Sequence, residues 1–144
     1  MLELIKIAKM GDYERAIKYS KQIFQQNENS PLFLNTMGII YRRTKDYEQA
    51  RLVTEKALGL DNTLVQAKLN IASIDIEEGL VDKAIYTLKN VLKENKNYSE
   101  AMTNLAYAFK KKGDFNSSIR YYRKALELPK KLPRSYFNLG TSLL

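Results

Sequence analysis

The sequence predicts an all-α solenoid in which antiparallel helix pairs stack on one another. Small residues recur every 34 residues along two lines of the chain: Ala16, Ala50, Ala84 and Ser118 on one, and Gly38, Ala72, Ala106 and Gly140 on the other. A fixed period of this size indicates stacked repeats, in which each unit buries its apolar face only against its neighbours. Within each period, apolar residues recur at steps of three and four, which indicates helices.

The first helix of the second unit begins at an N-cap. Ser30 supplies the capping side chain, and Pro31 stands in the first turn, where its missing N–H has no cost. Leu34, Met37 and Tyr41 then form one apolar face at helical spacing. A small residue, Gly38 in this unit, lets neighbouring helices approach closely while larger side chains interlock around it.

A tight turn leads into the second helix of each pair. Asp46 caps this helix in the second unit, and Leu80 offers no capping side chain in the third. The first helices of the other units end at glycine, where a left-handed residue is often required: Gly11, Gly79 and Gly113. Lys45 occupies this place in the second unit, so we expect a strained or altered turn there.

The same reasoning predicts nine helices along the chain. Their expected ranges are 1–10, 13–27, 31–44, 47–60, 65–78, 81–95, 99–112, 115–128 and 133–144.

These motifs resemble the tetratricopeptide repeat (TPR). The resemblance is carried by Leu34-x-x-Met37-Gly38-x-x-Tyr41 and Asp46-Tyr47-Glu48-x-Ala50, with counterparts such as Gly113-Asp114-Phe115 and Ala125-Leu126. It implies a right-handed superhelix of about four repeats plus a partial C-terminal helix. The expected single array over 1–144 divides into a partial repeat 1–30, repeats 31–64, 65–98 and 99–132, and a partial repeat 133–144. These ends predict a longer parent chain, with an incomplete natural array as the alternative.

The composition argues against catalysis. The chain has no cysteine and no histidine, so a thiolate metal site, a histidine base and a catalytic triad built on either residue are excluded. We therefore expect no enzyme activity, no cofactor and no metal. No apolar stretch reaches the roughly 18 residues that a membrane span needs, and a cytoplasmic location is expected by default.

Basic residues are concentrated near the C-terminus. Lys and Arg outnumber Asp and Glu 24 to 16, and residues 99–134 hold nine basic residues against three acidic ones. This excess predicts either a solvated basic face or a docking site for an acidic partner. Nucleic-acid binding is not expected, because the Lys110–Lys112 run suits the C-terminal end of a helix dipole.

The TPR resemblance implies a concave groove lined by the first helix of each pair. The predicted partner-binding residues are Asn35, Ile39, Arg42, Arg43, Asn70, Ser73, Asn104, Tyr107, Lys110, Lys111, Arg134 and Asn138. Asn70, Asn104 and Asn138 keep the 34-residue spacing, similar to the asparagine ladder of the O-linked N-acetylglucosamine transferases. Free carboxamides in such a row would hydrogen-bond the backbone of an extended peptide. The alternative is that they are asparagines on a solvated helix face.

Three further expectations follow. Asp75 stands where the family has an aromatic residue, so it must reach solvent, pair with a cation or mark a local opening. The apolar residues of 133–144, together with an exposed Leu2, Ile5 and Ile7, predict self-association through the terminal helices. The predicted function is a non-catalytic protein-interaction scaffold. The alternative is the substrate-docking arm of a larger enzyme, for example a glycosyltransferase-like parent, whose catalytic domain lies outside this chain.

Overall fold

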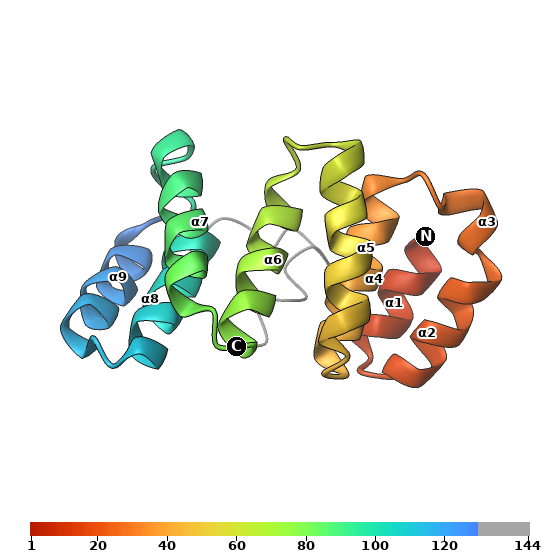
Figure 1. Cartoon of the computed structure of the whole chain (residues 1–144), viewed down its shortest axis with the longest axis horizontal. Coiled ribbons are helices and arrows are strands. Elements are labelled where there is room, and N and C mark those ends of the chain that lie inside the picture. The colour runs from red at the N-terminus through yellow and green to blue at the C-terminus, as the bar shows by residue number, and fades with distance from the viewer. Residues whose placement is uncertain (130–144) are drawn as a thin grey trace. The chain divides into compact units, whose positions relative to one another are not determined.

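The computed structural model describes residues 1–129, and every regular element in this range is a helix (Figure 1). The prediction of an all-α helix-pair solenoid is confirmed. The elements are α1 (Leu2–Lys9), α2 (Tyr13–Gln22), α3 (Phe24–Asn27), α4 (Pro31–Arg43), α5 (Tyr47–Leu60), α6 (Val65–Glu77), α7 (Val81–Glu94), α8 (Ser99–Lys112) and α9 (Phe115–Glu127).

One expected helix is broken. The range 13–27 consists of α2 and α3, because Ile23 leaves the helical conformation at φ −101° and ψ 8°. The side-chain amide of Asn27 donates to the Ile23 carbonyl at 2.7 Å, a side-chain bond of the kind that competes with regular helix hydrogen bonding. The expected helix 133–144 lies outside the described residues.

The described chain forms two compact units, residues 1–70 and the residues from 71 onward, with the border inside α6. In the first unit α4 packs on α5 and on α2, and α2 packs on α1. Its core is apolar and includes Leu4, Ile7, Phe33, Leu34 and Ile40, none of them more than 2% exposed. Continuity of a single array over 1–144 stays a prediction.

In the second unit α8 packs against both α7 and α9. Leu88 of α7 and Leu105 of α8 are fully buried. Ser118 allows α9 to come close to α8, and its hydroxyl donates to the Ala106 carbonyl at 2.8 Å. The rings of Phe109 and Tyr121 stack with centroids 5.6 Å apart, which fixes α9 against α8 on one side.

The turns between paired helices follow the expected chemistry. Lys45 has φ +66°, a left-handed conformation that costs a residue with a Cβ roughly 1–2 kcal/mol, so the expected strained turn is confirmed. The Asp46 carboxylate accepts from the Gln49 backbone N–H at 3.2 Å. Leu80 precedes α7 without a side-chain cap, as the sequence predicts.

Candidate functional site

A buried polar network in the first unit uses two of the predicted groove residues. Arg42 Nε donates to Asn70 Oδ1 at 3.0 Å, and Asn70 Nδ2 donates to Thr54 Oγ1 at 3.0 Å. The Thr54 hydroxyl donates in turn to the Ala50 carbonyl at 2.6 Å. Asn70 is only 4% exposed, and both ends of its carboxamide are engaged. The expectation that its side chain is free for a ligand is therefore wrong.

Gly38 makes room for this network. A Cβ at Gly38 would overlap Thr54 Oγ1 and would lie 2.8 Å from Asn70 Nδ2 and 3.4 Å from the Ala50 carbonyl oxygen. The small residue that the 34-residue period places here thus does more than allow helix contact. It leaves space for two polar side chains between α4, α5 and α6.

The other predicted residues of α4 are also largely covered. Asn35 is fully buried, and neither amide atom of its side chain has a hydrogen-bond partner among the residues that the structure describes. Ile39 is 5% exposed and belongs to the apolar core, whereas Arg43 is half-buried. A buried amide without a partner costs about 1–3 kcal/mol, so Asn35 is an unfavourable feature of the unit taken alone.

Asn104 on α8 differs from Asn70 although both occupy the same place in the repeat. It is 1% exposed, and both Nδ2 and Oδ1 lack a hydrogen-bond partner in the described part of the chain. The residues 34 positions after Arg42 and Thr54 are Ile76 and Leu88. These side chains offer neither the donor nor the acceptor that holds Asn70. Asn104 therefore does not lie on a solvated helix face, and its hydrogen-bonding capacity is unused among residues 1–129.

The predicted residues one turn further along α8 form a more open cluster. Tyr107 donates through its hydroxyl to Glu77 Oε1 at 3.4 Å, and Lys111 Nζ lies 5.5 Å from the centroid of the Tyr107 ring. Lys110 and Lys111 are exposed, and Ser73 of α6 is 7% exposed. The structure therefore places a buried amide close in sequence to a half-buried tyrosine and two exposed lysines.

Two predicted residues, Arg134 and Asn138, lie outside the described residues. Asp75 is fully buried, which excludes the first of its three predicted alternatives, that it reaches solvent. The sequence reasoning missed Thr54 and Glu77 as polar partners. Thr54 could have been found as a hydroxyl on an apolar helix face, since a buried hydroxyl needs a partner.

Local contacts shift the pKa of several titratable groups beside these helices. Burial, with the nearby Glu100 carboxylate as a second cause, raises the pKa of Tyr98 at the start of α8 to about 12. Burial and then the Asp46 carboxylate raise the pKa of Tyr41. Hydrogen bonds from Ser117 lower the pKa of the Asp114 cap. Residues 1–129 hold no group of three or more acidic side chains placed to bind a metal ion.

Comparison with known families decides the classification. The family described as tetratricopeptide repeat protein 21 ARM repeat matches residues 2–125. The chain belongs to this TPR family. The match spans α1 to α9 and agrees with the 34-residue period of the sequence.

Solved structures show the same fold. MamA from Desulfovibrio magneticus RS-1, residues 41 to the end, is 23% identical with a TM-score of 0.69, over 85% of this chain and 69% of that chain. A second MamA structure is 19% identical with a TM-score of 0.69, over 90% of this chain and 78% of that one. MamA MSR-1 is 18% identical with a TM-score of 0.67, over 86% and 71%. At these identities the likeness concerns the fold alone.

The TPR fold is that of a protein-interaction scaffold. Its repeats present extended surfaces built from many helices, and partners bind along them. Within the described range, none of the helices has the length and apolar character needed to cross a bilayer.

Proposed function

We infer that this TPR chain is a non-catalytic scaffold that binds an extended segment of another protein along the first helices of its repeats. The observation that carries the proposal is Asn104, whose carboxamide is buried and has no hydrogen-bond partner at either end within residues 1–129. An extended peptide backbone alternates N–H donors and C=O acceptors, so it can satisfy both ends of one carboxamide. Among the described residues, Asn104 is thus the one member of the predicted asparagine ladder whose carboxamide is not held by another side chain.

The neighbouring side chains favour an acidic segment. Lys110 and Lys111 are exposed on the same helix, and Lys111 already lies over the Tyr107 ring. A carboxylate on the bound segment would pair with these cations while its backbone reaches Asn104. Because Asn104 is covered in the free chain, binding must first open its surroundings, and we expect association slower than about 10⁵ M⁻¹s⁻¹.

Matched substitutions of the two asparagines test the proposal. Asn104→Leu replaces an unpartnered amide by an apolar group, so it should stabilise the fold by roughly 1–2 kcal/mol. Asn70→Leu leaves the buried Arg42 guanidinium and the Thr54 hydroxyl without this partner, so it should destabilise by roughly 2–4 kcal/mol. The same change is thus expected to act with opposite sign at two equivalent places of the repeat.

Binding is the second measurement. Peptides selected from a random display library on the wild-type chain would be titrated by fluorescence anisotropy against wild type and Asn104→Leu. We expect Asn104→Leu to lose about tenfold or more in affinity although it is the more stable protein. If the selected peptides bind the variant as tightly as the wild type, Asn104 does not contact them and the groove proposal fails.

A further inference from the structure

Three exposed basic side chains of the second unit gather around one pair of stacked rings. The rings belong to Phe109 of α8 and Tyr121 of α9, and their planes differ by only 7°. Lys89 Nζ of α7 lies 5.6 Å from the centroid of the Phe109 ring. Arg120 Cζ and Lys124 Nζ lie 5.3 and 5.2 Å from the centroid of the Tyr121 ring. We call these three cations the α7–α9 basic cluster.

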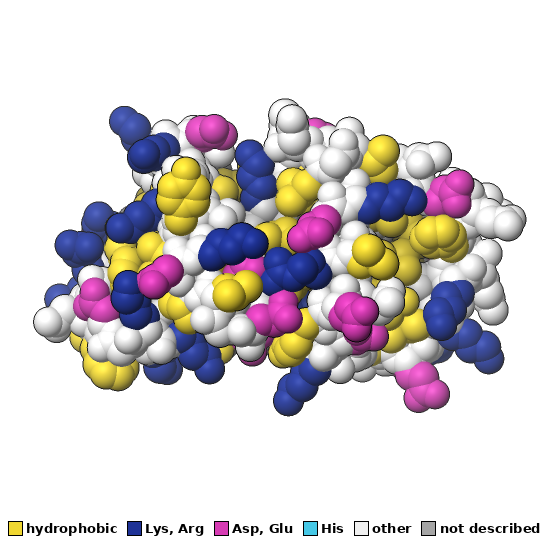
Figure 2. All heavy atoms as spheres, in the orientation of Figure 1, with side chains coloured by type: hydrophobic (Ala, Val, Ile, Leu, Met, Phe, Trp, Pro, Cys, Tyr) yellow, Lys and Arg dark blue, Asp and Glu magenta, His cyan; other side chains and the backbone are white. Residues whose placement is uncertain are grey.

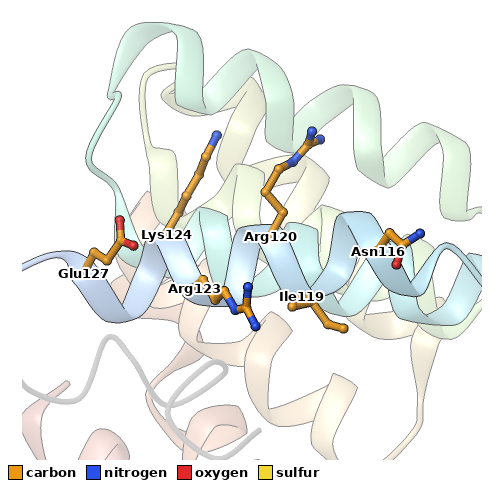
Figure 3. A pocket seen from close by; sticks show the side chains of 6 residues that line it. All are labelled: Asn116, Ile119, Arg120, Arg123, Lys124 and Glu127. Atoms are coloured by element: carbon orange, nitrogen blue, oxygen red, sulfur yellow. The ribbon is translucent and has the colours of Figure 1, made fainter.

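The cluster concentrates positive charge. Arg120 and Lys124 stand four residues apart on α9, and Figure 3 shows both extending to the same side of the helix, away from Ile119. Like charges at this spacing destabilise a helix. The contacts with the rings position the charged groups, but a cation–π contact does not neutralise a charge.

The nearest carboxylates are engaged elsewhere. In the described part of the chain, none of the three cations of the cluster takes part in an ion pair. Asp82 at the start of α7 pairs with Lys112 at 2.6 Å. Hydrogen bonds from Ser117 are the main cause of the lowered pKa of Asp114, and the charge of Arg120 is a minor one. Figure 2 shows Lys and Arg side chains gathered over α7 and α9.

The surface of α9 offers room beside these charges. Arg120 and Lys124 line a shallow hollow of about 580 Å³ on this helix. The other charged residues of its lining are Arg123 and Glu127, and Figure 3 shows Glu127 at one end of the row. Three cations against one carboxylate favour an anionic occupant.

The compactness of the cluster favours a phosphate group over carboxylates. A phosphorylated serine or threonine carries a charge of about −1.5 to −2 at pH 7 and three acceptor oxygens, so a single group can pair with several cations. A carboxylate carries one charge, and several acidic side chains would have to reach the same place. The planar guanidinium of Arg120 also matches a phosphate group in a bidentate way.

The surroundings argue against other carriers of phosphate. Single-stranded nucleic acids stack their bases on open aromatic rings. Here Phe109 is only 8% exposed, and Tyr121 is stacked on it with two cations over its own ring. A helix on a membrane surface buries apolar side chains beside its cations, whereas Ile119 extends away from Arg120 and Lys124.

We propose that the α7–α9 basic cluster binds a phosphorylated serine or threonine side chain of a partner protein. Arg120 and Lys124 contact the phosphate oxygens from α9, and Lys89 contacts them from α7. The site uses the second helices of two repeats, whereas Asn104 lies on a first helix, α8. The proposal does not depend on Asn104, so the groove and the cluster can succeed or fail independently.

The test uses three fluorescein-labelled peptides of about 11 residues with the same mixture of neutral flanking residues. Their central position holds phosphoserine, serine, or an Asp-Asp pair whose charge matches that of the phosphate. Each peptide is titrated with the full chain by fluorescence anisotropy at low salt. We expect phosphoserine to bind about tenfold more tightly than serine and about threefold more tightly than Asp-Asp.

Substitutions locate the binding site. Arg120→Gln with Lys124→Gln should remove the preference for phosphoserine, and Lys89→Gln alone should weaken phosphoserine binding about threefold. The control is Arg15→Gln with Lys18→Gln, the same two changes at exposed positions of α2. It makes the same change in net charge and should leave the preference in place. Circular dichroism melts check that each variant folds.

Several outcomes would overturn the proposal. Equal binding of phosphoserine and serine would show that the phosphate is not recognised, and equal binding of Asp-Asp would show a response to acidic charge in general. An equal loss in the α2 control would show a response to net charge alone. Unchanged binding by Lys89→Gln would show that α7 takes no part, and loss of binding in Asn104→Leu would show that the groove holds the phosphopeptide.

Two further probes test the other carriers of phosphate. One is an oligouridylate of about 12 nucleotides, and the other is phosphatidylcholine vesicles that contain a phosphatidylinositol phosphate. If either binds more tightly than the phosphoserine peptide and is lost in the Arg120→Gln with Lys124→Gln variant, nucleic acid or a lipid headgroup is the occupant and the proposal is wrong.

Discussion

Replacing Gly38 by alanine should destabilise the chain although Gly38 lies inside a helix. On propensity alone, glycine to alanine in a helix gains about 1 kcal/mol. The new methyl would overlap Thr54 Oγ1 and come within 2.8 Å of Asn70 Nδ2, so the buried network has to break or shift. Overpacking costs about 1–3 kcal/mol, and a buried amide left without its partner costs about 1–3 kcal/mol more. We expect a net loss of roughly 1–5 kcal/mol.

Gly59 provides the matched control because it lies in α5 of the same unit and a Cβ there would meet nothing within 4 Å. Gly59→Ala should therefore stabilise by about 0.5–1 kcal/mol. Urea unfolding followed by circular dichroism measures both changes. If Gly38→Ala raised the midpoint as Gly59→Ala does, the network would not fill the space beside Gly38.

A double-mutant cycle strengthens this test. Thr54→Ala removes the hydroxyl that a methyl at Gly38 would overlap, so the pair Gly38→Ala with Thr54→Ala should cost less than the sum of the single changes. We expect a coupling of about 1 kcal/mol or more, since the two residues share one space. Additive single effects would refute the steric argument.

Two other predictions concern the second unit. Ala84 is fully buried, so Ala84→Leu should lower the free energy of unfolding by roughly 1–3 kcal/mol. Lys83→Leu at the exposed neighbouring position should change it by no more than about 0.5 kcal/mol in urea unfolding. An unchanged midpoint for Ala84→Leu would mean a loose helix contact. The pKa of Tyr98 is raised to about 12, so the folded chain holds this proton more tightly than the unfolded chain. The resulting contribution to stability is complete below about pH 10 and is lost as the pH rises towards 12. Over this window the free energy of unfolding of the wild type should fall by about 1–2 kcal/mol relative to Tyr98→Phe. Parallel pH profiles of the two proteins would contradict the raised pKa.

The turns and helix starts were predictable from the sequence because their causes are local. A left-handed turn at Lys45 followed from its phase with glycines at the same place of other repeats, and its φ of +66° confirms it. The absence of a side-chain cap at Leu80 followed from its own side chain. The break at Ile23 was not predicted, because it coincides with a hydrogen bond from Asn27 that no periodicity encodes.

Burial of the asparagines could not be predicted from their register. The 34-residue spacing placed Asn70 and Asn104 at equivalent points, but the chemistry of each depends on side chains one repeat earlier. Thr54 and its neighbours close Asn70 into a network, whereas Leu88 stands at the equivalent of Thr54 for Asn104. A repeat fixes the position of a side chain, and the variable residues around it decide whether that side chain finds a hydrogen-bond partner within the fold.

The N-terminal helix alters the argument for self-association. The sequence analysis took Ile5 and Ile7 to be exposed on an uncovered end, but they are only 6% and 2% exposed. Ile7 belongs to the core cluster that includes Phe33. An amphipathic helix packs its apolar face against the core. Leu2 alone of the three remains open, at 78%. One apolar side chain is too little to drive association, so the N-terminal end no longer supports the prediction.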